Sequence, residues 1–485
     1  MVINCCRCRN RRQAIPTVTT FIRRSLSGLF SRGCALVALA MLASCGSSEW
    51  HAPSFGSTHE LIIATVNGPT TFFEDSQGNF AGFEHDLASL FAQKLGMSAK
   101  FVVYANRELL MQALANGKAH LAAAGLAAPP GGEESGLIFG PTYFKVQPQL
   151  AYNRSEPKPK NLAELSGKRV GYISAPGLDA LLKAQKAAYP GVDFSEVKKD
   201  SSDDLLSAVS DGTADYAIAY SNQIDIAEHY YPNIDTAFDI GPAVSLAWAF
   251  PENADSALLQ KARDFFAGIE KDGTLSRIID RYYGHIYRLE QADIVGFLGK
   301  MDSQLDTLRP YFEDAEEVTG IDWRLLAALA YQESHWDEHA TSPTGVRGIM
   351  MLTGDTADRL NVSDRLNPRQ SIMAGARYLA MLKDEIPPGV REPDRTWFAL
   401  AAYNVGTAHL EDAMQLAKRL KKNPDSWVDL KDVLPLLSRP GYFGTVQHGF
   451  ARGGEAVIMV GSIRNYYDLL TKYKPPHVPV FKMHF

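Results

Sequence analysis

The pattern of hydrophobic residues changes near residue 290, and this change restricts the chain to an architecture with more than one domain. Between about residues 60 and 286, short β-rich runs alternate with segments of helical periodicity. From about residue 294 onward the strand pattern is lost and the chain has nearly all helical periodicity. Alternating strands and helices are typical of parallel sheets with helices on both faces. We therefore expect a multidomain protein with a bilobed α/β module followed by a mainly α domain.

Several segments predict individual elements of this plan. The pattern restarts after residues 147–161, which predicts two lobes around a cleft. Asp322 stands where it can cap the clearest helix, over residues 322–334. Strands are expected at residues 61–66, 101–104, 121–125, 169–173 and 215–220, and further helices at residues 178–189, 205–209, 372–383, 396–403 and 454–473.

The first 45 residues hold all five cysteines and have the features of an export signal. Residues 33–42 are apolar but too short to span a bilayer. They lead into Leu42-Ala-Ser-Cys45-Gly46, which resembles a bacterial lipoprotein cleavage box. The resemblance implies a signal peptide at residues 1–44, lipidation of Cys45 and a polar tether at residues 45–59. No Asp follows Cys45, which by the same resemblance favours the periplasmic side of a Gram-negative outer membrane. The alternative is a plain signal peptide with an incidental cysteine.

The charge distribution excludes one class of partner. The chain has a formal net charge of −6, and its first 44 residues hold seven arginines and no acid, so the remainder carries −13. An acidic body argues against nucleic acid as a partner. Walker-type, GxGxxG and GxSxG motifs are missing from the sequence, so nucleotide-binding and serine-hydrolase functions lack their usual signals. We expect neither a cofactor nor a metal.

Two segments resemble the periplasmic solute-binding domains of the amino-acid type. They are Gly78-Asn-Phe-Ala-Gly-Phe-Glu-His-Asp-Leu87 and Asn161-Leu-Ala-Glu-Leu-Ser-Gly-Lys-Arg-Val-Gly171, and the likeness covers residues 60–288. It implies a regulatory module that closes around a muropeptide or another small ligand.

One departure from this family concerns the ligand. Such domains clamp a ligand carboxylate with a Thr and an Arg that follow an Ala-Gly-Leu segment. Here the residues after Ala124-Gly-Leu126 contain no Arg and include the acids Glu133 and Glu134. A bidentate guanidinium is hard to replace in carboxylate recognition, so this departure argues against free amino acids as ligands. The alternative is a fold kept for scaffolding or for contact with protein or cell wall.

Glu333 is the strongest catalytic candidate in the helical part. Leu326, Leu329 and Ala330 precede it by seven, four and three residues, so its side chain leaves from the apolar face of the helix. A carboxylate against apolar surface loses hydration, which raises its pKa and keeps it protonated near neutrality. This is the requirement for a general acid in glycosidic cleavage.

Four segments in order resemble the lytic transglycosylase family, whose fold is lysozyme-like. They are Gln332-Glu-Ser-His-Trp336, Ser342-Pro-Thr-Gly-Val-Arg-Gly-Ile-Met-Met-Leu352, Ala401-Ala-Tyr-Asn-Val-Gly406 and Val460-Gly-Ser-Ile-Arg-Asn-Tyr-Tyr467. The resemblance implies a catalytic domain over residues 294–480 that cleaves peptidoglycan strands between N-acetylmuramic acid and N-acetylglucosamine without water, leaving 1,6-anhydromuramyl ends.

The same resemblance implies roles for individual residues. Glu333 is expected to serve as both acid and base, with Ser334 hydrogen-bonded near it. Tyr403 and Asn404 are expected to line the cleft, and Gly345 and Gly348 to let the chain pass close to the substrate. Many family members have Gln at the position of Met351, so one substrate hydrogen bond is expected to be absent here.

Three alternatives remain open for the helical part. A hydrolytic muramidase needs a second carboxylate, for which Asp337, Glu338 and Asp355 are candidates. A cell-wall ligand sensor with an inactive lysozyme-like domain needs none. His335-Trp-Asp-Glu-His339 also fits the H-x-x-E-H pattern of zinc peptidases, although the Pro343 that follows shortly predicts that the helix ends before His339.

Overall fold

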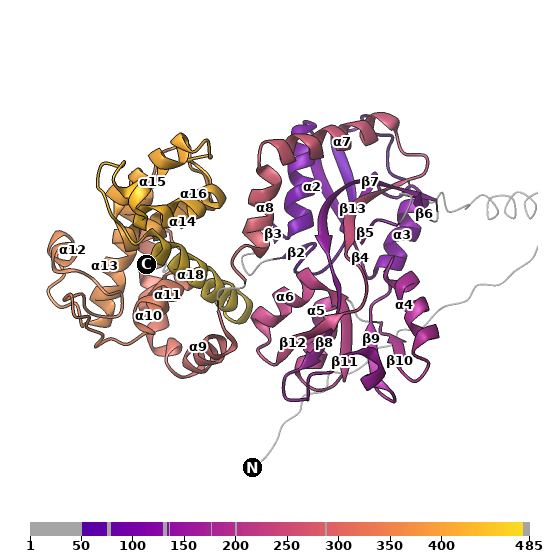
Figure 1. Cartoon of the computed structure of the whole chain (residues 1–485). Coiled ribbons are helices and arrows are strands. Elements are labelled where there is room, and N and C mark those ends of the chain that lie inside the picture. The colour runs from indigo at the N-terminus through magenta and orange to yellow at the C-terminus, as the bar shows by residue number, and fades with distance from the viewer. Residues whose placement is uncertain are drawn as a thin grey trace, which may run out of the picture. The chain divides into compact units, whose positions relative to one another are not determined.

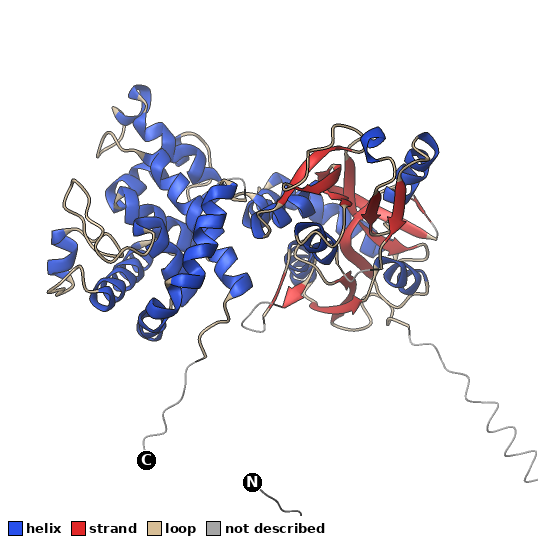
Figure 2. Ribbon diagram, turned by 90° about the horizontal axis from the view of Figure 1, so that it is seen from below, coloured by secondary structure: helices blue, strands red, loops and turns tan. Residues whose placement is uncertain are grey.

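The strands predicted from the alternating pattern form two separate sheets in the computed structural model of the chain (Figure 1). The structure describes residues 51–74, 79–129, 133–134, 136–175, 177–198, 201–286 and 289–478. The predicted signal peptide and Cys45 therefore lie outside the described residues. In the described part, the strands belong to the N-terminal module, and the chain beyond residue 290 forms helices joined by loops (Figure 2). None of the described helices is both long and apolar enough to cross a bilayer.

The first lobe is built on a six-stranded sheet that the chain enters twice. Its strand order is β4(Ser98–Tyr104)–β1(Glu60–Val66)–β5(Leu121–Ala127)–β13(Val244–Pro251)–β7(Leu137–Val146)–β6(Glu133–Glu134). Strand β1 pairs in parallel with β4 and β5, whereas β13 is antiparallel to β5 and β7. The helices of this lobe are α2(Phe83–Lys94), α3(Arg107–Ala115), α7(Ser256–Lys271) and α8(Thr274–Tyr283), and a small hairpin pairs β2(Phe73–Glu74) with β3(Phe80–Ala81).

The second lobe contains a five-stranded sheet of order β10(Asp193–Glu196)–β9(Arg169–Tyr172)–β11(Tyr216–Tyr220)–β8(Pro148–Asn153)–β12(Ile234–Asp239). Its helices are η1(Leu162–Leu165), α4(Leu178–Ala188), α5(Ser202–Ser210) and α6(Ser221–Tyr230). The chain enters this lobe between β7 and β8 and returns between β12 and β13. Two short connections therefore join the lobes, and the prediction of two α/β lobes is confirmed.

The expectation of parallel sheets is only partly correct. Each sheet holds a parallel core of the expected strands, with antiparallel strands beside it, namely β13 and β7 in one sheet and β8 and β12 in the other. The antiparallel strands arise because the chain crosses between the lobes and then returns. The local sequence pattern does not predict this return to the first lobe, since the return depends on contacts between residues distant in sequence.

The helical domain contains α9(Gln291–Ser303), α10(Leu305–Thr319), α11(Trp323–Ser334), α12(Gly354–Arg359), α13(Pro368–Glu385), α14(Asp394–Val405), α15(Thr407–Arg419), α16(Trp427–Val433), η2(Leu434–Ser438), α17(Pro440–Phe443) and α18(Gly453–Tyr473). Asp322 caps α11 as predicted, accepting a hydrogen bond from the amide of Arg324. Nine consecutive residues of α11, from Trp323 to Tyr331, are buried. A helix buried on all sides is a core element, so α11 is the central helix of this domain.

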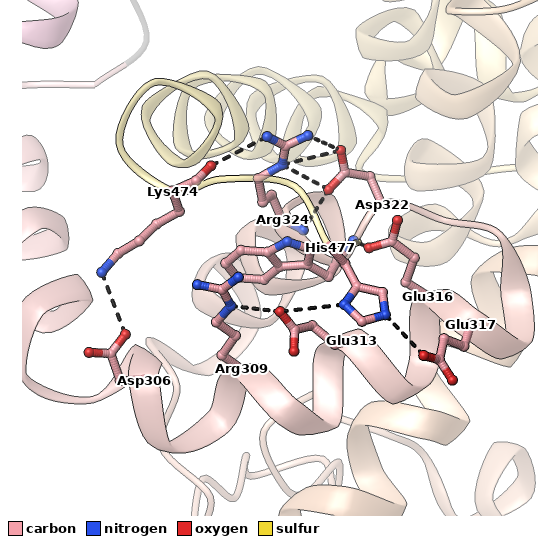
Figure 3. A network of polar contacts seen from close by, with 10 residues as sticks. Asp306, Arg309, Glu313, Glu316, Glu317, Asp322, Arg324, Lys474 and His477 are labelled. Atoms are coloured by element: carbon pink, nitrogen blue, oxygen red, sulfur yellow. Dashed lines mark hydrogen bonds and ion pairs between the residues drawn. The ribbon is translucent and has the colours of Figure 1, made fainter. Parts of the chain in front are cut away.

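A polar network anchors the N-terminal end of α11 (Figure 3). Arg324 is 2% exposed, and its guanidinium forms an ion pair with Asp322 at 2.6 Å and donates to the carbonyl of Lys474 at 3.4 Å. Tyr467 of α18 also donates to Asp322, at 3.0 Å. Beside this group, Arg309 of α10 stacks on Trp323 at 4.8 Å. The network therefore connects α11 to α10, to α18 and to the segment that follows α18.

We expect Arg324→Met to lower the free energy of unfolding by about 3–5 kcal/mol, because Asp322 would keep its largely buried negative charge without its cationic partner. The matched control is Arg369→Met, which removes an exposed ion pair with Asp314 and should change stability by less than about 1 kcal/mol. Urea denaturation followed by far-ultraviolet circular dichroism measures both. Equal effects of the two substitutions would show that the network does not stabilise the domain.

Candidate functional site

Glu333 lies in the last turn of α11, where the helix stops being surrounded by the core. His335 and Trp336 have positive φ angles of 52° and 60°, so the helix ends at Ser334 and the chain turns sharply. Trp336 turns back and donates its ring N–H to the carbonyl of Ala327 at 2.8 Å. This fixed turn holds Glu333 at the boundary between the apolar core and a pocket.

Burial raises the pKa of Glu333 to about 7, because the carboxylate form loses hydration there. Loss of hydration is the single cause of the shift, and it acts in the direction expected from the sequence. A carboxyl group with this pKa is about half protonated at neutral pH. It can therefore both donate and accept a proton near neutrality.

The pocket beside Glu333 has a volume of about 280 Å³. Its lining comes from three helices: Gln332 and Glu333 from α11, Asn404 from α14, and Glu455, Ile458 and Met459 from α18. Among the described residues that line this pocket, Glu455 is the second carboxylate. The pocket therefore combines one largely buried acid, two amides, one exposed acid and two apolar side chains.

A loop over residues 340–352 runs next to the end of α11. Its backbone folds on itself through bridges of Arg347 to Thr341 and to Leu352. Gly348 has a φ of 79°, and a Cβ atom there would lie 1.8 Å from the carbonyl oxygen of Arg365, so only glycine fits. Met351, with a φ of 46°, also has a backbone conformation that side chains rarely adopt. The loop is therefore held in a strained, specific shape.

Two residues predicted to contact substrate also hold this loop in place. The Ser334 hydroxyl donates to the carbonyl of Ile349 at 2.8 Å and shares its hydrogen with the carbonyl of Ala330 at 3.2 Å. Tyr403 donates its hydroxyl to the carbonyl of Met350 at 2.9 Å. The hydroxyl of Ser334, the residue after the acid, therefore bonds to backbone carbonyls and connects the end of α11 to the loop.

Tyr403 nevertheless lies close to the acid. Its pKa is raised well above the usual value, first by burial and second by the charge of Glu333. Its phenol therefore stays protonated at physiological pH. Asn404, the next residue of α14, lines the pocket together with Glu333. The structure thus brings Tyr403 and Asn404 close to Glu333, and Asn404 lines the pocket with it.

The other two residues predicted to contact substrate, Gly345 and Met351, belong to the loop over residues 340–352. Gly345 has a φ of 83°, nothing lies within 4 Å of the position of a Cβ atom, and its carbonyl accepts from Arg365 at 2.9 Å. Arg365 also donates to the carbonyl of Leu352 at 2.8 Å, so one guanidinium fastens both arms of the loop. Sequence reasoning missed Arg365, because only the folded loop brings these two carbonyls to one side chain.

The structure also gives the positions of the alternative carboxylates and of the two histidines in the zinc-peptidase pattern. Asp337, Glu338 and Asp355 do not line the pocket of Glu333, whereas Glu455 does. The sequence predicted the helix that carries Glu455, over residues 454–473, but the segment that resembles the family, residues 460–467, begins five residues after Glu455. His335 ends α11 and His339 is 76% exposed in the following loop, so the two histidines do not share a helix face. Over the described ranges, no three His, Cys, Asp or Glu side chains cluster as a metal site would require.

Two family models match the chain. The bacterial extracellular solute-binding proteins, family 3, match residues 61–285, and the transglycosylase SLT domain matches residues 310–426. The first corresponds to the two α/β lobes. The second includes α11 with Glu333, the loop over residues 340–352, and α14 with Tyr403 and Asn404.

Curated relatives align over nearly the whole chain. A membrane-bound lytic murein transglycosylase F from Nitrosospira multiformis is 48% identical over 94% of this chain and 95% of its own length. Its namesakes from Methylobacillus flagellatus and Thiobacillus denitrificans are 46% and 39% identical, over 92% and 94% of this chain and 95% and 96% of their own. Both halves of the chain, in this order, therefore have the same relatives. The chain belongs to the membrane-bound lytic murein transglycosylase F family.

Proposed function

We propose that this protein is a peptidoglycan lytic transglycosylase in which Glu333 is the single catalytic acid and base. The observation that carries the proposal is a carboxyl group with a pKa raised to about 7 in the wall of a pocket lined by Asn404 and close to the Tyr403 phenol. A catalytic group of this pKa is matched to proton transfer in both directions at neutral pH.

The proposed reaction proceeds through two proton transfers. Protonated Glu333 donates its proton to the oxygen between N-acetylmuramic acid and N-acetylglucosamine, and the bond from this oxygen to the anomeric carbon breaks. The resulting carboxylate takes the proton of the muramyl 6-hydroxyl, whose oxygen bonds to the same anomeric carbon. Glu333 regains its proton, and the product has a 1,6-anhydro ring. The nucleophile belongs to the substrate, so its effective concentration is high and no water needs to be positioned.

Neighbouring residues support this reaction in different ways. We propose that Tyr403 and Asn404 contact the reacting sugar, and that Met351 and Gly345 approach the glycan from the loop. Ser334 and Arg365 position that loop through their bonds to backbone carbonyls. The strained φ of Met351 supports a functional role, because such conformations concentrate at active sites.

We also propose that the mature chain is anchored by a lipid on Cys45 to the periplasmic face of the outer membrane. The support is the segment Leu42-Ala-Ser-Cys45-Gly46 after a short apolar core, together with the membrane-bound relatives. The α/β module, by its similarity to solute-binding proteins, is proposed to bind a muropeptide or another small ligand and to regulate the catalytic domain.

Glu333→Gln should lower the rate of glycan cleavage by at least about a hundredfold, because the amide can neither donate nor recover the proton. Mass spectrometry of digested sacculi measures the effect, and wild-type protein should release anhydro ends, which are one water lighter than hydrolysed ends. Glu338→Gln, the same change on the exposed loop, is the control and should retain activity. Hydrolysed ends from wild-type protein would instead indicate a muramidase using Glu455, and equal activity of Glu333→Gln would overturn the proposal.

The pH dependence should follow from the raised pKa of Glu333. Cleavage begins from the protonated acid, so kcat/KM should be constant below about pH 7 and fall about tenfold per pH unit above it. The free energy of unfolding should likewise be lower at high pH than at low pH. Ionising Glu333 in the fold is unfavourable, so Glu333→Gln should melt at a higher temperature than wild type at pH 9 and at a similar temperature at pH 4. An activity that rises through pH 7, or a stability gain only at acid pH, would contradict this assignment.

Cys45→Ser should move the protein from the membrane pellet to the soluble periplasmic fraction, because the acceptor of the lipid is lost. Fractionation of cells producing either form, followed by immunoblotting, measures the shift. Cys34→Ser, within the predicted signal peptide, is the matched control and should remain in the pellet. A Cys45→Ser protein that stays in the membrane fraction would rule out this anchor.

A further inference from the structure

An exposed aromatic side chain lies on the loop over residues 444–452, which joins α17 to α18 in the helical domain. Phe450 is 55% exposed, and its ring meets that of Phe443, the last residue of α17, edge to face at a centroid distance of 5.8 Å. We call Phe443 and Phe450 the aromatic shelf. Exposed apolar surface rimmed by polar groups is typical of places where a ligand binds, because water hydrates such surface unfavourably.

The loop that carries the exposed ring is fixed to the domain through its backbone. The carboxylate of Asp412 in α15 is 1% exposed and accepts from the amides of Gln447 and His448 at 3.0 and 2.8 Å. Arg419, also of α15, donates to the carbonyl of Thr445 at 2.8 Å. The ring is therefore presented by an ordered loop, and a surface that is ordered in advance loses little entropy when it binds.

One exposed strip of the domain connects the aromatic shelf to the catalytic pocket. In the first two turns of α18, Glu455 and Ile458 are exposed and line this pocket. Arg452, exposed between the shelf and α18, forms an ion pair with Glu455 at 3.4 Å. The five residues of chain from Phe450 to Glu455 span at most about 18 Å. A polymer that leaves the pocket along this strip therefore reaches the shelf within a few of its units.

The chemistry of the strip suits a sugar ring. A pyranose has an apolar face of C–H groups and an edge of hydroxyl and amide groups, so it is held by a flat apolar surface with hydrogen-bonding groups beside it. The aromatic shelf supplies the flat apolar surface. Gln447, His448 and Arg452 are exposed on the same loop and supply hydrogen-bonding groups.

The loop offers little to a peptide that binds through its main chain. Recognition of an extended peptide by strand addition needs a row of free amides and carbonyls. In this loop, the amides of Gln447, His448 and Ala451 and the carbonyl of Thr445 are already bonded to other parts of the domain. The loop therefore presents its side chains as the binding groups, which favours a glycan over a peptide.

We propose that Phe450, supported by Phe443, stacks on a sugar of the glycan strand that lies outside the pocket, and so selects long strands over short ones. This inference rests on the proposed function, because it takes the polymer in the pocket of Glu333 to be a glycan. Phe450 has no part in the proton transfers. The affinity for long strands therefore depends on its ring, whereas the rate of bond cleavage does not.

The test is the binding of peptide-free glycan strands to the full mature protein carrying Glu333→Gln, so that binding is measured without cleavage. The strands are released from sacculi by an amidase, sorted by length and titrated calorimetrically. We expect Phe450→Ala, added to this protein, to weaken binding of long strands about tenfold and to leave binding of the shortest strands unchanged. Phe450→Trp should keep the affinity for long strands, and Phe450→Leu should lose most of it because Leu lacks a flat ring.

Phe80→Ala is the matched control, because Phe80 in the α/β module is also 55% exposed. It should bind every strand as the parent protein does, and circular dichroism checks that all variants fold. The inference is overturned if no strand binds or if Phe450→Ala binds long strands as tightly as the parent. It is also overturned if the loss appears only with strands that carry stem peptides, which would assign the aromatic shelf to the peptide.

Cleavage by proteins with Glu333 intact separates this inference from the proposed function. Phe450→Ala should raise KM for long strands about tenfold with kcat unchanged, because a contact made equally in the ground state and the transition state is lost. Hydrolysed ends together with this rise in KM would overturn the catalytic proposal and support the aromatic shelf. Anhydro ends with an unchanged KM would support the catalytic proposal and overturn the aromatic shelf.

Discussion

The burial of α11 is the constraint on which the catalytic half depends. Its residues from Trp323 to Tyr331 are enclosed, and the ion pair of Arg324 with Asp322 fixes its beginning. A helix packed in this way leaves only its last turn to meet solvent, and this turn carries Glu333. The position of the acid and its raised pKa therefore have one origin, because the same packing that orders the helix removes water from the carboxyl group.

The pocket is assembled from elements distant in sequence around this fixed point. Helices α14 and α18 supply Asn404 and Glu455, while the loop over residues 340–352 is fastened by Ser334, Tyr403 and Arg365. Most of these fastening bonds end on backbone carbonyls. The loop can therefore keep its shape while several of its side chains stay available for other contacts, which suits a site that must hold a long polymer.

Local patterns predicted much of this structure. Strand β1, the cap at Asp322 and helix α18 follow from periodicity and capping chemistry, which act between near neighbours. The apolar residues three, four and seven positions before Glu333 likewise predicted the direction of its pKa shift. The return of the chain through β13, the carboxylate of Glu455 in the pocket and the guanidinium contacts of Arg365 were not predicted. Each of these depends on residues that only the tertiary fold brings together.

Two glycines of the loop over residues 340–352 differ in what they allow. At Gly348 a single added carbon would overlap the backbone of Arg365, so this position accepts hydrogen alone. At Gly345 the surrounding space is open, and the obstacle is the φ of 83°, which Asn and Asp tolerate better than other residues. Natural variation or engineering that diversifies these two loop positions is therefore confined to Gly345. The backbone at Gly345 permits substitution by a residue with a short polar side chain, such as Asn or Asp.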